Sequence, residues 1–278
     1  MLVKLLLAVS FVGFLVVALF NPACACGPDV EKDLAGRHLR LLSWNIGNGD
    51  LEKETRAHDD DIPAVAKLIL EQDADVVALQ ELTGEDQLEL LLKQLNSGYR
   101  GYVSEGGNGD RVDAVLVKRS HSEGLPDFRS APAAGKFFAT ATFTLGKDLP
   151  QVTIVSAHAD AFSAQGRRRF VDDVVDWARP RAKNGMTFIA GDFNLEVSTR
   201  TKNNLFTNDV KHDSESYSQL LKYFRDLGLN AGETAVNDRR IDYIFGPPTT
   251  VRLHSAEVLR ESAVGQMDHW PLFVDVSF

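Results

Sequence analysis

Cysteine is nearly absent from this chain, and this absence excludes one class of fold. The only two cysteines, Cys24 and Cys26, lie near the start of the 278-residue sequence. A disulfide-stapled fold is therefore excluded for everything that follows them. The sequence also lacks internal repeats, low-complexity tracts and any long apolar run after Phe20. With 44% hydrophobic and 25% charged residues, it can instead build one ordinary hydrophobic core.

An excess of basic residues is missing as well. The sequence carries 30 Lys and Arg against 39 Asp and Glu, a formal net charge of −9. This balance provides no general attraction to a polyanion such as nucleic acid. Two basic clusters, Arg167-Arg168-Arg169 and Arg239-Arg240, could still form a local basic rim. The alternative is that they are solvated faces of a helix and a loop.

The first 25 residues have the pattern of an export signal. Lys4 is their only charge, Leu5 to Phe20 is an uncharged run, and Ala23-Cys24-Ala25 is an A-x-A cleavage site. The run is shorter than the roughly 20 residues that span a bilayer, so we expect cleavage and a secreted or periplasmic protein. Two alternatives stay open, an uncleaved membrane anchor and a lipoprotein acylated at Cys26.

Strand-like and helix-like stretches alternate after this segment. Runs rich in Val, Ile, Leu and Phe predict strands at 39–46, 75–82, 113–118, 137–145, 152–157, 186–190, 241–245, 251–259 and from 272. Apolar residues at helical spacing predict helices from Asp61 and over 85–95, 165–182 and 216–227. Several strands are apolar on both faces, as in strands covered on both sides. Together these patterns predict an α/β sandwich.

Oxygen-donor side chains follow several of these strands. Glu81 ends an apolar strand, where a carboxylate is costly unless it is paired or binds a metal. Asn45, after Leu-Leu-Ser-Trp, could add a neutral oxygen or orient a phosphate, and Asp268 could share the cation. Such donors suit Mg²⁺, Mn²⁺ or Ca²⁺ rather than zinc.

The tetrapeptide Gly191-Asp192-Phe193-Asn194 follows another apolar strand. Asp192 and Asn194 are two residues apart and can point to the same side. In a hydrolase, such an aspartate can hold or deprotonate the attacking water, and the asparagine can hydrogen-bond a phosphate. Taken alone, the tetrapeptide is commonly just a turn.

Two histidines have comparable settings. His269, within Met-Asp-His-Trp-Pro, precedes the last strand and could exchange a proton with a phosphate oxygen or leaving group. Asp242, in Arg-Ile-Asp-Tyr-Ile, is its expected orienting partner. His158 ends a further strand and is the second candidate imidazole, with Asp113 as a candidate partner.

This ordered set of motifs resembles the endonuclease/exonuclease/phosphatase family, the relatives of deoxyribonuclease I. The resemblance covers residues 38–278, expected to form one domain after the signal at 1–25. It implies a four-layer α/β sandwich, two packed mixed β-sheets flanked by helices. It also implies divalent-metal-dependent hydrolysis of phosphate esters, with the matched positions in the roles just given.

The sequence departs from this family at two positions. Many nuclease members carry an arginine two residues after the metal-binding glutamate and a tyrosine after the following glycine loop; here those positions hold Thr83 and Arg111. Arg111 could replace the tyrosine as a phosphate-binding residue, or be an ordinary loop arginine. 

Three readings of the substrate and function stay open. The expected substrate is DNA or RNA, and the first alternative is a phospholipid or small phosphodiester. The second is a non-catalytic binding protein of the same fold. No obligate protein partner is indicated.

Overall fold

The computed structural model describes residues 38–47, 59–107, 109–146, 149–197 and 210–278. The expected signal at 1–25, with Cys24 and Cys26, lies outside the described residues. The chain divides into two units, Met1–Gly36 and Arg37–Phe278, and the described residues belong to the second. Within the described ranges, every helix is too short or too polar to span a bilayer.

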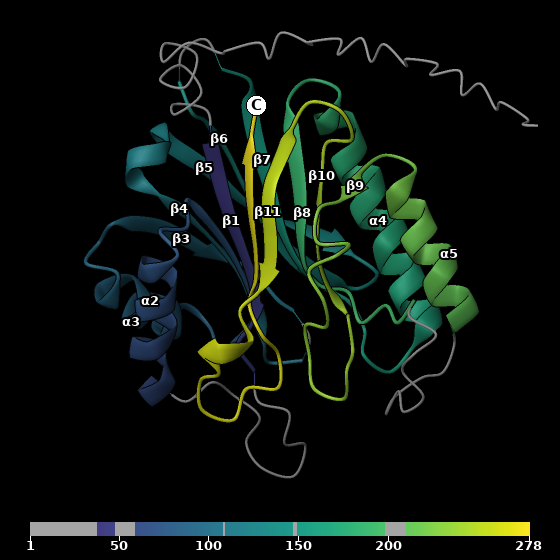
Figure 1. Ribbon diagram of the computed structural model, residues 1–278, viewed down its shortest axis with the longest axis horizontal. Helices are drawn as coiled ribbons and strands as arrows, with labels where there is room; N and C mark the ends of the chain where they lie inside the picture. The colour runs from purple at the N-terminus through teal and green to yellow at the C-terminus, as the bar shows by residue number, and fades with distance from the viewer. Residues whose placement is uncertain (1–37, 48–58, 108, 147–148, 198–209) are drawn as a thin grey trace, which may run out of the picture. The chain divides into compact units, whose positions relative to one another are not determined.

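Two six-stranded sheets form the centre of the described part of this domain (Figure 1). The first has the order β11-β12-β1-β2-β4-β3 and the second the order β5-β6-β7-β8-β10-β9. The first sheet consists of β1 (His38–Asn45), β2 (Val76–Leu82), β3 (Tyr99–Val103), β4 (Val112–Lys118), β11 (Arg252–Val258) and β12 (Leu272–Ser277). The second consists of β5 (Glu123–Ala133), β6 (Lys136–Thr144), β7 (Gln151–His158), β8 (Met186–Asp192), β9 (Arg225–Asp226) and β10 (Asp242–Gly246).

Helices cover the outer faces of both sheets, which confirms the expected four-layer sandwich. The α-helices are α2 (Ile62–Glu71), α3 (Glu85–Gln94), α4 (Ala164–Ala182) and α5 (Val210–Leu221), and the short 3-10 helices are η1 (Asp59–Asp61), η2 (Arg119–His121) and η3 (Arg260–Ser262). Helices α2 and α3 pack on the first sheet, α4 and α5 on the second (Figure 1).

The alternating side chains of each strand explain why so many strands are apolar throughout. In β7, Val152 and Ile154 enter the core between the two sheets, whereas Val155 and Ala157 pack toward α4. Each strand of this kind therefore contributes to two cores at once.

The prediction was wrong for one helix and incomplete for three strands. The helix expected over 216–227 ends at Leu221, because the chain turns there and Arg225–Asp226 pair with β10 as β9. Strands β3, β5 and β9 were not predicted. Strand β5 contains Pro126 and Pro132, which a strand tolerates at the edge of a sheet, where β5 lies.

Two parallel strand pairs determine where the polar side chains gather. Strand β1 is parallel to β2, and β7 is parallel to β8, so the carboxyl ends of each pair lie side by side. Strand β10 runs antiparallel to β8, with Asp242 opposite Asp192, and Asp192 is opposite His158. One row across the second sheet thus carries three predicted site residues.

Gly191 lies in β8 directly before Asp192 and opposite Ala157 of β7. Its φ is 147°, and a Cβ atom at this position would lie 1.9 Å from the carbonyl oxygen of Ala157 on β7. We expect Gly191→Ala to lower the free energy of unfolding by about 2–6 kcal/mol, through backbone strain and overpacking. Urea denaturation measures this. Gly146→Ala is the control, since the added methyl there makes only ordinary contacts; equal stability of both variants would contradict the prediction.

Candidate active site

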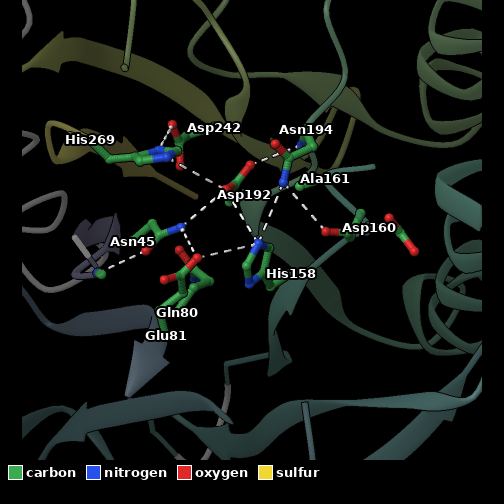
Figure 2. Close-up of polar contacts among 12 residues, drawn as sticks. Asn45, Gln80, Glu81, His158, Asp160, Ala161, Asp192, Asn194, Asp242 and His269 are labelled. Atoms are coloured by element: carbon green, nitrogen blue, oxygen red, sulfur yellow. Dashed lines mark hydrogen bonds and ion pairs between the residues drawn. The ribbon is translucent and has the colours of Figure 1, made fainter. Parts of the chain in front are cut away.

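The predicted polar residues gather at one end of the sandwich, where strands of both sheets end (Figure 2). The first sheet contributes Asn45 from β1 and Glu81 from β2, and the second contributes His158, Asp192 and Asp242 from β7, β8 and β10. A buried polar contact joins the two sheets just below them. There the side chain of Gln80 donates to the hydroxyl of Ser156, which itself donates to the carbonyl of Leu79, both at 3.0 Å.

Asp192 lies at the centre of the cluster and is buried. Its Oδ1 accepts the backbone N–H of Asn194 at 2.9 Å, and its Oδ2 accepts the side-chain amide of Asn45 at 3.1 Å. Burial alone would raise the pKa of this carboxyl, but His269, His158 and these hydrogen bonds lower it below its ordinary value. Asp192 is therefore an ionised carboxylate at neutral pH and a candidate base for water.

Asn45 connects the two carboxylates of the cluster. Its Nδ2 donates to Glu81 Oε1 and to Asp192 Oδ2, each at 3.1 Å. Its oxygen accepts the backbone N–H of Gly47 at 2.9 Å. Because the amide nitrogen contacts the carboxylates, this arrangement favours a hydrogen-bond donor role for Asn45 over that of a metal ligand.

Glu81 has an unusual backbone conformation, with a φ of 66°. It lies where the pairing of β2 with β4 is interrupted between Leu79 and Leu82, and such irregularities re-aim side chains. Arg111 contacts Glu81 Oε2 through its guanidinium. Two roles were left open for Arg111, a phosphate-binding residue or an ordinary loop arginine. In the structure, its guanidinium offsets the negative charge of Glu81, the predicted metal ligand.

His269 and Asp242 form the expected pair, with Nδ1 of the imidazole 2.9 Å from Asp242 Oδ2. Burial alone would lower the pKa of His269, but Asp242 and Asp192 raise it to about 10. Burial also raises the pKa of Asp242, so the two groups compete for one proton. We place that proton on the imidazole, because two carboxylates act on the ring. The indole of Trp44 donates to the backbone carbonyl of His269 at 3.1 Å, which holds its loop against β1.

His158 and Asn194 lie on the other side of Asp192 from His269 (Figure 2). The Nε2 of His158 is 3.5 Å from Asp192 Oδ2 and 3.4 Å from Asn194 Nδ2. Asp113 was expected to be a partner of the His158 ring. Instead, it accepts the backbone N–H of His158, and burial raises the pKa of its carboxyl well above the ordinary value.

For Asp268, which was expected to share the cation, the role of metal ligand stays a prediction. Its backbone carbonyl accepts the N–H of Val236 at 2.9 Å, and its charge raises the pKa of His269 only as a minor contributor. The buried carboxylate beside His269 is Asp242. Ligand atoms of Asp192, Asp242 and His269 lie within 4.8 Å of one another and form a candidate metal group.

The residues present fit a divalent cation. Among the described residues, Asp242 Oδ1 is buried without a hydrogen-bond partner, and Gly47 lets the Glu81 carboxylate lie close to the backbone, since a Cβ there would lie 1.9 Å from Glu81 Oε2. The donors are mostly oxygen atoms, as Mg²⁺, Mn²⁺ and Ca²⁺ require. A cation bound by these carboxylates would offset charge on phosphate oxygens.

The arrangement supports acid-base hydrolysis of a phosphate ester. The ionised Asp192 can accept a proton from water, and the protonated His269 can donate one to a phosphate oxygen or leaving group. Asn45, Asn194 and His158 surround the same space and can hydrogen-bond phosphate oxygens.

The raised pKa of His269 predicts a dependence of stability on pH. Because its folded-state value of about 10 exceeds the ordinary 6.5, its contribution is fully present below pH 6.5 and is lost as the pH rises through about 10. In EDTA, the stability advantage of the unsubstituted protein over His269→Gln should therefore shrink between pH 6.5 and 10. Urea unfolding at three pH values measures this, and a constant difference would contradict it.

Three arginines of the two basic clusters are paired with carboxylates of the protein. Arg167 is buried and donates to Asp213 at 2.9 Å, and Arg168 contacts Glu215. Arg240 donates to both oxygens of Asp226, at 2.8 and 2.6 Å. Arg167 and Arg240 are therefore held in largely buried ion pairs, whereas Arg168 makes a surface ion pair.

Two polar residues near the site were missed from sequence. Lys136 begins β6, one residue before the start of the predicted strand, and lies 3.9 Å from Asp160 in the loop after β7. A lysine at the start of a strand is too common to be singled out. Its neighbour Asp160 follows His158 by two residues and could have been recognised from that spacing.

Comparisons with known proteins agree with this architecture. No curated protein matches the chain. The human nocturnin catalytic domain with bound sulfate is 18% identical, with a TM-score of 0.64 over 87% of this chain and 94% of that one. A mannosyl-6-phosphatase from Bacteroides thetaiotaomicron is 19% identical, with a TM-score of 0.64 over 86% and 100%. D. rerio TDP2, humanized by 14 mutations, is 16% identical, with a TM-score of 0.65 over 87% and 99%. At these identities the similarity shows the fold alone.

The family of the chain is shown by a family model that matches most of its sequence. The model of the Endonuclease/Exonuclease/phosphatase family matches residues 42–271, a range that includes every predicted site residue. The chain belongs to this family, whose members are divalent-metal-dependent hydrolases of phosphate esters.

Proposed function

We propose that this protein is an exported phosphodiesterase that uses Mg²⁺, Mn²⁺ or Ca²⁺, with DNA or RNA as its first candidate substrate. The observation that supports it best is the buried group around Asp192. There the ionised carboxylate of Asp192 lies between two imidazoles, those of His158 and of the protonated His269, and Asn45 links it to Glu81. A binding protein has no need of this combination. Export is proposed from the N-terminal sequence pattern.

A phospholipid or small phosphate ester is the second candidate substrate, and one observation favours it. Arg167 and Arg240 are largely buried and pair with carboxylates of the protein, so they are poorly placed to bind a polyanion. A small substrate needs few cations, whereas nucleic-acid binding relies on many.

The first experiment is nicking of supercoiled plasmid by residues 27–278, with Mg²⁺ or with EDTA. We expect metal-dependent nicking that His269→Ala reduces at least about 100-fold. Bis(p-nitrophenyl) phosphate is hydrolysed in parallel to test for small substrates. A nuclease should lose activity steeply with added salt, whereas an enzyme for small esters should be nearly indifferent.

Each outcome separates the candidates. Hydrolysis of the small diester without nicking would move the assignment to small or lipid substrates. Failure to cleave plasmid, RNA, phospholipid and small esters in the presence of each cation would overturn the enzyme assignment in favour of a binding protein.

A further inference from the structure

Lys136 places a buried positive charge beside the active site. Strand β6 is antiparallel to β7, with Ala139 opposite Ser156, so the start of β6 lies next to the end of β7 that carries His158. The Nζ of Lys136 is buried, and among the described residues it has no hydrogen-bond partner.

The carboxylates near Lys136 do not account for its position. Asp160 Oδ2 is 3.9 Å from Nζ, beyond hydrogen-bond distance. The other oxygen of Asp160 accepts the backbone N–H groups of Phe162 and Ser163 at 2.7 and 3.0 Å. Asp160 is therefore held by its own loop and does not depend on the lysine. Asp113, the next carboxyl that acts on Lys136, is buried, and burial raises its pKa well above the ordinary value, which disfavours its charged form.

A structural role for this ammonium would be costly. It carries three N–H donors, and burying them without an acceptor destabilises a fold. Burial accordingly lowers the pKa of Lys136. A methionine of similar length would fill the same space without that cost. Buried polar groups that lack hydrogen-bond partners are concentrated at functional sites, where they are retained for function rather than for stability.

We propose that Lys136 is a substrate-binding residue whose ammonium holds a phosphate oxygen on the His158 and Asn194 side of the site. The ligand chemistry is a phosphate oxyanion, which would supply the missing hydrogen-bond acceptors. His269 lies on the opposite side of Asp192, so the two cationic groups would contact different oxygens of the phosphate. This inference rests on the proposed function, because it takes the same cluster to be the phosphate site.

Inorganic phosphate is the probe that tests this proposal. Its binding is measured by calorimetry, in Mg²⁺, for the unsubstituted protein and for Lys136→Met, Lys136→Arg and Lys67→Met. We expect Lys136→Met to raise the dissociation constant about 10–100-fold, the usual range for a hydrogen bond to a charged group. Lys136→Arg should retain most of the affinity. Lys67→Met should change nothing, because Lys67 is an exposed residue of α2.

The thermal midpoint gives a second, independent readout. If Lys136 binds substrate, the Tm of Lys136→Met should be unchanged or higher by up to about 3 °C, since the substitution removes a buried charge that has no hydrogen-bond acceptor among the described residues. If Lys136 serves the fold through Asp160, the same variant should lose several degrees. Unchanged phosphate affinity in Lys136→Met, no phosphate binding by the unsubstituted protein, or a variant that fails to fold would each overturn the proposal.

Hydrolysis of bis(p-nitrophenyl) phosphate by the same samples separates this inference from the proposed function. An active unsubstituted protein with unchanged phosphate affinity in Lys136→Met would refute the inference alone. No hydrolysis of this ester or of the other tested substrates by the unsubstituted protein would refute the proposed function, whatever the phosphate titration shows.

Discussion

Asp192→Asn should lower kcat by about 10³-fold, within the usual range for loss of an acid-base group. Asparagine has the same shape and can still accept the backbone N–H of Asn194 at Oδ1. It cannot accept a proton from water, and it removes the negative charge that helps to keep His269 protonated. The measurement is steady-state hydrolysis, in Mg²⁺, of whichever substrate the unsubstituted protein cleaves.

The control for this substitution is Asp127→Asn, which makes the same chemical change at an exposed residue of β5 paired with Arg129. It should retain full activity. The double variant Asp192→Asn with His269→Ala should be little worse than the more damaging single variant, because groups that act as a unit are not additive. An Asp192→Asn protein that keeps a tenth of the original kcat would rule out Asp192 as the base.

Glu81→Gln should remove the response to Mg²⁺ and lower activity by two to three orders of magnitude, on the order of what a cation contributes to phosphate chemistry. Glutamine keeps the length of the side chain and can still accept from Asn45. It loses the negative charge that attracts a cation. The direct measurement is the Tm with and without Mg²⁺, which should rise by about 5–10 °C in the unsubstituted protein at a hundredfold excess over Kd.

Glu71→Gln is the matched control, since Glu71 is an exposed residue of α2 paired with Lys67. It should keep both the activity and the Mg²⁺ response. If Glu81→Gln keeps the Mg²⁺ response and Asp242→Asn loses it, the cation belongs to the group of Asp192, Asp242 and His269 instead.

The residues that the structure gathers in this cluster could be singled out from the sequence because local pattern and chemistry coincide there. Asn45, Glu81, His158 and Asp192 each end an apolar strand, and strand ends can be read from a run of neighbouring residues. Parallel pairing of β1 with β2 and of β7 with β8 then brings those ends together. The family resemblance supplied the two-sheet architecture that joins them, which composition and periodicity do not specify.

Only the tertiary structure decided how the charges are paired. Arg167 with Asp213, Arg168 with Glu215 and Arg111 with Glu81 join residues that are 46, 47 and 30 positions apart. The neighbouring residues in the sequence do not distinguish an arginine of this kind from one that faces solvent. Whether a basic cluster can form a rim for a polyanion depends on that distinction.

The same limit applies to Lys136, which sequence analysis passed over. Its setting depends on what surrounds the ammonium: a loop that already holds Asp160, the buried carboxyl of Asp113 with its raised pKa, and the neighbouring strand end with His158. Periodicity records how each residue is placed relative to its chain neighbours. Burial and hydrogen-bond partners depend on residues that folding brings together from distant positions, so the sequence determined the strand ends and the fold determined their electrostatics.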